Sequence, residues 1–147
     1  PLDRLAQELP ELLDLRRHLH AHPELSGEEH QTAALVSGEL RSLGWRVREG
    51  VGRTGVLAEL GPDQGPTVGL RVDMDALPVE ERTGLPYASK RQGVMHACGH
   101  DLHTCTGLGV ARLLAAVPTL QARVRLLFQP AEEIAQGAIW IRDVGAT

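Results

Sequence analysis

The chain has 147 residues, of which 42% are hydrophobic and 23% charged, as is usual for a single globular domain with a core of its own. Its net charge of −4 gives no reason to expect nucleic acid or an anionic membrane as a partner. The sequence has no apolar run near the roughly 20 residues of a membrane span, and its start lacks a signal-peptide pattern. Two cysteines are too few for a disulfide framework, so we expect reduced thiols and a cytoplasmic protein.

The N-terminal segment Leu2–His20 is predicted to form a helix, because its leucines recur at steps of three and four residues. Pro10 is expected to kink or split this helix. His18, His20 and His22 alternate at its end, but no carboxylate or cysteine stands at a matching spacing. His18 and His22 are therefore interpreted as structural residues. His20 stays open as a residue that supports a site from outside the ligand set.

A second helix is predicted over Gly27–Leu43. Ser26 and Glu29 have the spacing of a capping box at its start, and Gly44 fits the residue that follows its end. The remaining predicted elements are strands over 46–48, 56–60, 67–72 and 122–128, a helix over 102–117 capped by Asp101, and a helix over 136–143.

Strands separated by helices predict an α/β sandwich with a mixed sheet. The strand over 67–72 (TVGLRV) has the continuous apolar character of a buried strand. In such folds, sites gather beyond the carboxyl ends of strands. We therefore expect three loops to meet there, with the sequences DMDALP, MHACGHD and QPAEE.

The stretch Met95–Thr104 (MHACGHDLHT) concentrates three histidines, an aspartate and a cysteine. Cys98 and His100 are two residues apart, so on an extended segment their side chains point the same way, whereas on a helix they would diverge by about 200°. Thiolate and imidazole are preferred ligands of zinc-like ions, and the following helix N-terminus favours a thiolate. The stretch predicts a metal site that uses Cys98 and His100. For His96 and His103, a supporting or packing role fits equally well.

Three other interpretations of this stretch stay open. A structural zinc site normally has four protein ligands, often from paired units, and no second unit appears in the sequence. A cysteine nucleophile with a histidine base would also use Cys98, although so short a separation suits shared ligation better. The histidines could also be plain surface or capping residues, but His, Cys and Asp seldom cluster without a site.

Four carboxylates add to the candidate site. Glu132 and Glu133 follow a strand, and adjacent residues outside a helix point in different directions. One of them can bind a metal while the other acts as a general base on a water molecule. Asp73 and Asp75 could share a face toward the same site, with Asp75 bonded to a ligand histidine. The alternatives are a solvated acidic pair for the glutamates and a cap or turn contact for the aspartates.

Four motifs occur along the chain in the order RRHLHAHPELSGEEHQTA, LRVDMDALPVEE, MHACGHDLHT and LLFQPAEE. Together they resemble the zinc-peptidase-like amidohydrolases, in the branch of aminoacylase, hippurate hydrolase and auxin-conjugate hydrolase. The resemblance covers most of the chain. It implies a three-layer α/β/α sandwich with a mixed, mostly parallel sheet, in which residues 1–147 form the N-terminal portion of the catalytic domain.

The resemblance also implies an activity and a ligand set. The site would hold two divalent ions (zinc, manganese, cobalt or nickel) and hydrolyse the amide bond of N-acyl amino acids or small peptides. By motif position, Cys98, His100 and Glu133 would be metal ligands, Glu132 the general base and Asp75 a supporting residue. The implied partner is thus a small-molecule substrate, and the oligomeric state stays open.

The sequence departs from that family in several features. Family members carry two further ligand histidines and a satellite domain that covers the site and forms dimers, and none of these precedes Thr147. The sequence IAQG stands where the family has a run of glycines. Three protein ligands are also too few for two well-coordinated ions. A truncated, non-catalytic metal-binding domain of the same fold is therefore a second hypothesis, and a cysteine-nucleophile hydrolase is a third.

Overall fold

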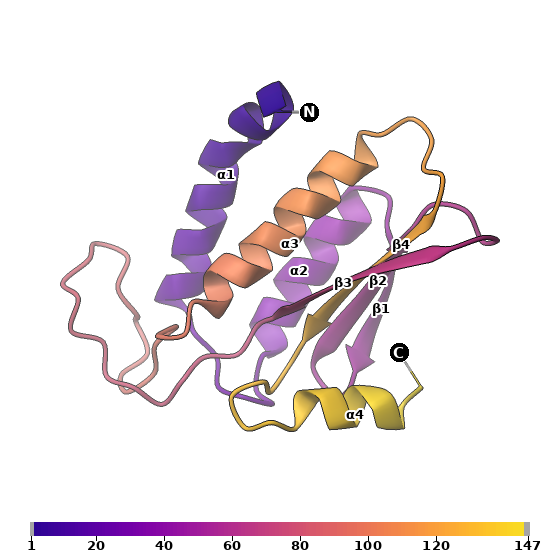
Figure 1. Ribbon diagram of the computed structural model, residues 1–147. Helices are drawn as coiled ribbons and strands as arrows, with labels where there is room; N and C mark the ends of the chain where they lie inside the picture. Colours follow the sequence, from indigo (N-terminus) through magenta and orange to yellow (C-terminus); the bar gives the residue numbers. More distant parts are fainter. Residues whose placement is uncertain (1, 146–147) are drawn as a thin grey trace.

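The computed structural model describes residues 2–145, without the side chains of Leu2 and Leu5. Two helices come first, three strands follow, and α3, β4 and α4 complete the order (Figure 1). Their bounds are α1 (Leu2–Ala21), α2 (His30–Ser42), β1 (Arg46–Val51), β2 (Gly55–Leu60), β3 (Thr67–Asp73), α3 (His100–Ala115), β4 (Arg123–Gln129) and α4 (Gly137–Asp143).

The strands form one mixed sheet in the order β1-β2-β4-β3. A tight turn joins β1 to β2, so these strands run antiparallel, whereas the chain between β3 and β4 contains α3 and can return to the same end of the sheet. The α/β class and the mixed sheet are thus confirmed. The described strands do not, however, form a mostly parallel sheet. The β3–β4 pairing is parallel, and both pairings of β2 are antiparallel.

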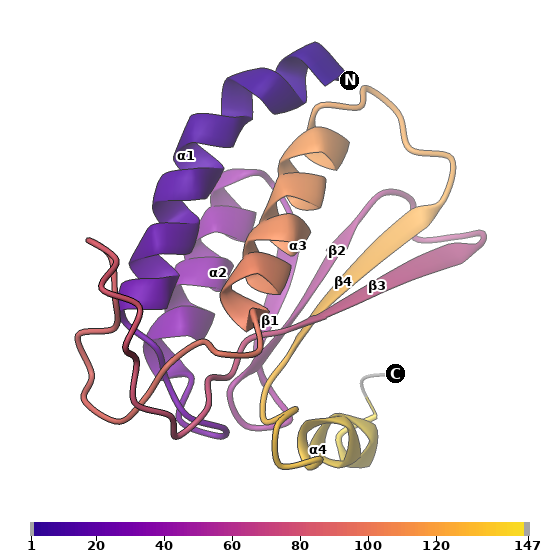
Figure 2. The ribbon, with the colours of Figure 1, turned by 60° about the vertical axis from the view of Figure 1, so that its left-hand side comes forward.

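Helices α2 and α3 cover one face of the sheet, and α1 packs against α3 on the same side (Figures 1 and 2). On the opposite face, Ile141 of α4 packs against Val51 and Leu57 at one end of the sheet. The second helical layer that the resemblance implies is therefore represented, among the described residues, by α4 alone. None of the described helices is both long and apolar enough to cross a membrane.

The main core lies between the three helices and the sheet. Its largest buried side chains include Phe128 and Leu126 of β4, Leu108 of α3 and Leu40 of α2, none more than 1% exposed. Gly107 allows α3 to pack closely, because a Cβ atom there would lie 3.0 Å from the ring of Phe128. This packing fixes the first turn of α3 relative to the end of β4.

The first helix confirms its predicted apolar face only in its second half, because Leu9, which belongs to that face, is 48% exposed. Leu12 and Leu19 are buried against the rest of the molecule. The helix continues through Pro10 without a split, because Pro10 is exposed and water can reach the backbone groups around its ring. The predicted contributions of the Leu2 and Leu5 side chains lie outside the described residues.

The start of α2 differs from the predicted capping box. Its N-cap residue, Glu29, makes no side-chain bond to the helix. The N–H groups of Gln31 and Thr32 instead donate to the two carboxylate oxygens of Glu24, at 3.0 and 2.8 Å. Glu24 therefore satisfies the free backbone donors that every helix start leaves, and both members of the predicted box bind elsewhere.

The prediction of a buried strand over 67–72 is wrong for most of β3. Val68 and Leu70 are 57% and 37% exposed, and only Val72 and Asp73 at the carboxyl end are buried. The reason is position, because β3 pairs with β4 on one side and forms an edge of the described sheet. A run of apolar residues does not reveal whether a second strand or helix covers it.

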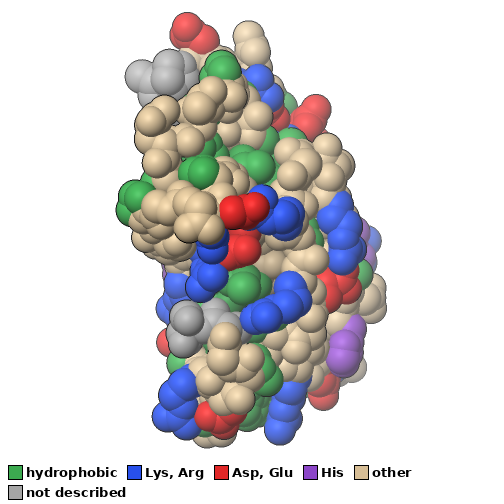
Figure 3. Space-filling model, turned by 90° about the vertical axis from the view of Figure 1, so that its right-hand side faces the viewer, with side chains coloured by type: hydrophobic (Ala, Val, Ile, Leu, Met, Phe, Trp, Pro, Cys, Tyr) green, Lys and Arg blue, Asp and Glu red, His purple; other side chains and the backbone are tan. Residues whose placement is uncertain are grey.

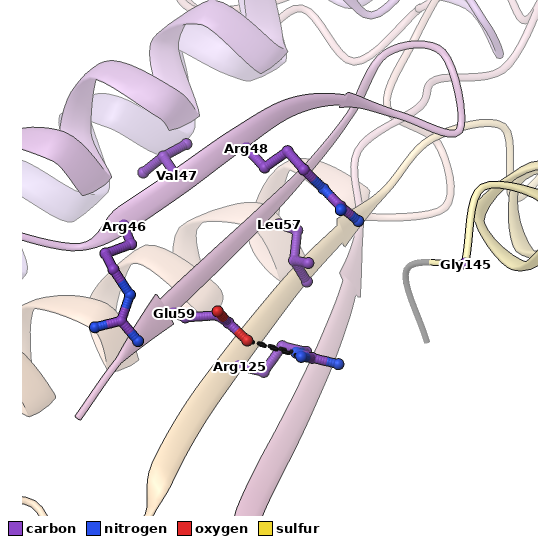
Figure 4. A pocket seen from close by; sticks show the side chains of 7 residues that line it. All are labelled: Arg46, Val47, Arg48, Leu57, Glu59, Arg125 and Gly145. Carbon is purple, nitrogen blue, oxygen red and sulfur yellow. Dashed lines mark hydrogen bonds and ion pairs between the residues drawn. The ribbon is translucent and has the colours of Figure 1, made fainter. Parts of the chain in front are cut away.

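The sheet face opposite the three helices is polar and rich in arginine (Figure 3). A hollow of about 290 Å³ on this face is lined by Arg46, Arg48, Glu59 and Arg125, among others. Arg125 donates to the Glu59 carboxylate at 2.8 Å (Figure 4). None of the predicted site residues lines this hollow, so its arginines are separate from the candidate metal ligands.

Gly137 lies at the start of α4, where a side chain has no room. A Cβ atom there would lie 1.7 Å from the carbonyl oxygen of Pro130. The substitution Gly137→Ala is expected to lower the free energy of unfolding by roughly 1–3 kcal/mol, the usual cost of overpacking, in urea denaturation followed by circular dichroism.

Gly38→Ala is the matched control, because a Cβ atom at this exposed position of α2 would meet nothing within 4 Å. Alanine is the better helix former, so stability should stay unchanged or rise by up to about 1 kcal/mol. An equal loss of stability in both variants would contradict the packing argument.

Candidate metal centre

The three predicted loops meet at one edge of the sheet. Strands β3 and β4 are parallel, and Asp73 pairs in register with Gln129 at their carboxyl ends. The DMDALP and QPAEE segments therefore leave the sheet next to each other. The third loop ends where α3 begins at His100, beside the same edge (Figure 1).

One donor atom from each of Cys98, His100 and Glu133 lies within 4.8 Å of the others. His100 is 2% exposed, and its Nδ1–H donates to the carbonyl oxygen of Asp75 at 2.9 Å. This bond leaves Nε2 free to face the two glutamates. Its distance is 3.7 Å to Glu133 Oε1 and 3.8 Å to Glu132 Oε2.

These side chains fit a metal ion of the kind that the resemblance implies. Oε1 of Glu133 is buried and has no hydrogen-bond partner among the described residues. A buried carboxylate oxygen without a partner is costly, and a cation would compensate it. Sulfur, nitrogen and oxygen donors together suit zinc and similar divalent ions.

Without a metal, both Cys98 and His100 hold their protons more firmly than usual. The Glu133 carboxylate beside Cys98, burial and the charges of Glu132 and Asp73 raise the pKa of the Cys98 thiol. Burial opposes a charge on His100, but the Asp75 hydrogen bond and the charge of Asp73 outweigh it and raise the pKa of His100 to about 9. The expectation that the helix N-terminus favours a Cys98 thiolate is therefore wrong for the metal-free protein, because carboxylates surround the thiol.

Asp75 binds several parts of the site at once. Its Oδ2 accepts hydrogen bonds from Ser26 Oγ at 2.6 Å and from the backbone N–H of Glu133 at 3.0 Å. Its Oδ1 lies 3.3 Å from Nδ1 of His100. Burial alone would raise the pKa of Asp75, but these bonds lower it to about 2. Asp75 is thus an ionised acceptor that holds both His100 and the segment of Glu133.

Asp73 faces the same imidazole from the other side. Its Oδ1 lies 3.6 Å from His100 Nε2 and 2.5 Å from His103 Nδ1. The rings of His100 and His103 stack, with centroids 5.5 Å apart. Asp73, His100 and His103 form a second group of donors within 4.8 Å of one another. The two aspartates therefore both face the candidate site, as their spacing indicates.

Two residues that the sequence assigned to a helix cap support the site instead. Ser26 binds Asp75, 49 positions away. Glu29 is 0% exposed and accepts bonds from Thr54 Oγ1 at 2.5 Å and from the backbone N–H of Ala131 at 2.8 Å. Glu29 thus fixes the QPAEE turn, in which Ala131 has a positive φ of 50°. The one signal in the sequence for these roles is that Ser26 and Glu29 both lie in the HPELSGEE segment, which belongs to one of the four motifs.

The predicted N-cap, Asp101, is also used differently. The N-cap of α3 is Gly99, with φ of 86°, and Asp101 lies within the first turn. Its Oδ1 accepts from the N–H of Leu102 at 2.9 Å, while Oδ2 faces Arg16 and His20 of α1, each at 2.8 Å. An aspartate can serve either as a helix N-cap or as the acid of a buried ion pair, so the sequence alone does not show which role Asp101 has.

His96 is buried, at 4% exposed, and its two ring nitrogens have no hydrogen-bond partner within the described part of the chain. Burial lowers the pKa of His96 to about 4. It is thus a neutral imidazole beside the cluster, and it is not among the grouped donors.

Zinc binding near pH 7.5 is expected to release about two protons per ion, because the proton-bearing Cys98 and His100 must both lose a proton to become ligands. Calorimetric titration in two buffers of different ionisation enthalpy measures this number. Affinity should rise with pH, and the rise should continue past the His100 pKa of about 9, because the pKa of the Cys98 thiol is itself raised. Cys98→Ser should release about one proton fewer, since serine does not ionise here. Release near zero in the unaltered chain would contradict ligation by these residues.

Comparison with known proteins identifies the chain's relatives. The sequence profile of peptidase family M20/M25/M40 matches residues 69–147. A relative in Synechocystis, named only as a probable hydrolase, is 56% identical over 99% of this chain and 38% of its own length. N-acetyl-L-cysteine deacetylase of Bacillus subtilis is 50% identical over 92% of this chain and 33% of its own length.

A solved structure shows the same fold. The YXEP protein of Bacillus subtilis, described as a dinuclear metal binding peptidase from the M20 family, superposes with a TM-score of 0.87 at 45% identity. The match covers 92% of this chain and 39% of that one, so the chain spans about two fifths or less of the length of these relatives. On the evidence of the profile, the relatives and the fold, the chain belongs to peptidase family M20/M25/M40.

Proposed function

We propose that this chain carries part of the active site of a metal-dependent hydrolase that cleaves the amide bond of N-acyl amino acids or related small amides. The observation that carries the proposal is the meeting of Cys98, His100 and Glu133 from two distant loops, with a buried, unpaired oxygen on Glu133. Family membership supports the hydrolase class. The deacetylase among the relatives supports an N-acyl amino acid as the substrate class.

In this proposal, Cys98, His100 and Glu133 hold a divalent ion, either zinc, manganese, cobalt or nickel. A bound ion of this kind polarises a carbonyl group and lowers the pKa of water. The relative described as dinuclear supports a second ion, for which Asp73 and His103 offer donors beside His100. Neither group alone supplies the four ligands that zinc usually takes, so further ligands would come from water, substrate or other parts of a longer protein.

Glu132 is the proposed general base. Its side chain is 39% exposed and its carboxylate lies 3.8 Å from His100 Nε2, whereas the Glu133 side chain is 17% exposed. The more exposed carboxylate can reach a water molecule, take its proton and pass the proton to the leaving amine. The more buried one suits ligation. The difference in burial between these adjacent residues supports the division of roles.

Asp75 is proposed as a positioning residue rather than a proton donor. Its pKa of about 2 keeps it ionised at neutral pH. Its backbone carbonyl accepts the Nδ1–H of His100 and orients the ring, so that Nε2 faces the ion. Its carboxylate holds the N–H of Glu133, which ties the position of one proposed ligand to that of another.

A second candidate function is metal binding without catalysis. The small number of donors in each described group favours it. A cysteine-nucleophile hydrolase finds less support, because the raised pKa of Cys98 leaves little thiolate at neutral pH. For the compartment, we propose the reducing cytoplasm, since Cys98 and Cys105 are both free and Cys98 is exposed.

Glu132→Gln is expected to abolish turnover, by at least the 10²–10⁴-fold typical of a lost general base, while the amount of bound metal stays nearly unchanged. Glu133→Gln should lower the metal content itself, because an amide is a weaker ligand than a carboxylate. Elemental analysis and an assay with N-acetyl amino acids separate the two effects. Loss of bound metal in Glu132→Gln would contradict the assignment of the base.

Chelation and thiol alkylation distinguish the three functions. Hydrolysis of an N-acyl amino acid by this chain with added manganese or zinc, lost on chelation and restored by the metal, is the expected result. Activity that survives chelation but not alkylation would support the cysteine nucleophile. Metal binding without turnover in this chain and in a longer family member containing it would support the non-catalytic domain.

A further inference from the structure

We propose that His20 is a positioning residue that sets the distance between Cys98 and His100 by binding the two segments that carry them. The inference rests on the proposed metal site and names a residue of α1 that belongs to neither donor group. His20 is 3% exposed, although it lies in a helix whose neighbouring residues Arg17 and His18 face solvent. A buried histidine needs partners for both ring nitrogens.

The first contact of His20 holds the helix that carries His100. Its Nδ1 lies 2.8 Å from Oδ2 of Asp101, which directly follows His100. Asp101 is 0% exposed and also bonds Arg16 Nε at 2.8 Å. A buried carboxylate with two such partners has little freedom to move. The first turn of α3, and His100 with it, is thus fixed to α1.

The second contact holds the segment that leads to Cys98. Nε2 of His20 lies 3.2 Å from Oε1 of Glu81, in the irregular excursion between β3 and α3. The second oxygen of Glu81 accepts from the N–H of Ser89 at 2.6 Å, so the same carboxylate braces the excursion. Tyr87 of this excursion also packs edge-on against the His20 ring, with centroids 5.7 Å apart.

The excursion is closed three residues before Cys98. The backbones of Leu77 and Met95 exchange two hydrogen bonds of 3.0 Å, which close the excursion at the first residue of the MHACGH stretch. The N–H of Lys90 donates to the carbonyl of Ala21 at 2.8 Å, next to His20 in sequence. The His20 imidazole therefore lies between the first turn of α3, which carries His100, and the excursion that leads to Cys98. Its removal should make the distance between Cys98 and His100 more variable.

The test measures metal affinity, since side chains that orient ligands usually change affinity by about 10–100-fold. In the 147-residue chain, His20→Ala is expected to weaken zinc binding by about 10–100-fold in competition with a chromophoric chelator. The cobalt form should also lose part of its thiolate-to-cobalt absorption per bound ion, because Cys98 no longer stays in reach. His18→Ala, on the same helix but exposed, should bind within about twofold of the unaltered chain.

Glu81→Leu is the second variant, because leucine is of similar size and has no group that can bond His20 Nε2 or the N–H of Ser89. It should weaken zinc binding less than His20→Ala and reduce the thiolate–cobalt absorption, while Asp101 stays bonded. Circular dichroism and thermal unfolding of the metal-free proteins identify the folded variants. If His20→Ala does not fold, Glu81→Leu decides, and unchanged affinity and absorption in it would overturn the proposal.

The result also separates this proposal from the proposed function. If the unaltered chain binds zinc and a folded His20→Ala binds it equally well with full cobalt absorption, the positioning role is wrong and the metal site stands. If affinity falls only by the fraction of unfolded protein, His20 is merely structural and the proposal is overturned. If the unaltered chain binds no zinc or cobalt, both proposals are wrong.

Discussion

The contact between Asp75 and His100 is the constraint on which the candidate site depends. Asp75 lies just beyond β3, and its carbonyl fixes one nitrogen of His100 so that the other faces the glutamates. Its carboxylate holds Ser26 and the N–H of Glu133. A single residue therefore connects the end of a strand, the start of α3, the turn after β4 and the loop before α2. This arrangement is possible because β3 and β4 are parallel and end at the same edge.

Around this contact, the metal-free site contains more acid groups than bases to balance them. Asp73, Glu132 and Glu133 all lie within 4 Å of the same imidazole. The Glu133 carboxylate and the charges of Glu132 and Asp73 help the Cys98 thiol to keep its proton, whereas the Asp75 hydrogen bond and the charge of Asp73 do so for His100. The same negative charge gives a divalent cation a favourable field. Proton and metal thus compete for the same atoms.

Features that repeat over a few residues could be predicted from the sequence. The leucine spacing of α1, the strand over ARVRLLF and the ends of α4 agree with the structure to within a few residues. The joining of the DMDALP, MHACGHD and QPAEE loops also follows, because it needs only the order of the strands and a rule about their carboxyl ends.

Contacts between distant residues could not be predicted in this way. Ser26 and Glu29 match a local capping pattern, yet their bonds reach Asp75 and Ala131 across 49 and 102 positions. A short polar side chain satisfies either a nearby helix end or a remote partner, and only the packed chain decides which. Asp101 is ambiguous in the same way, because its contacts with Arg16 and His20 form only when α1 packs against α3.

The exposed strand β3 has a consequence for the chain in solution. Its outer border presents backbone N–H and C=O groups that pair with no strand among the described residues, next to the uncovered side chains of Val68 and Leu70. Such a border is a template onto which another extended segment can add. Arg71 places one charge near the carboxyl end of β3, and a single charge opposes pairing with another strand only weakly. The tendency of this chain to associate with further copies of itself will therefore increase with its concentration.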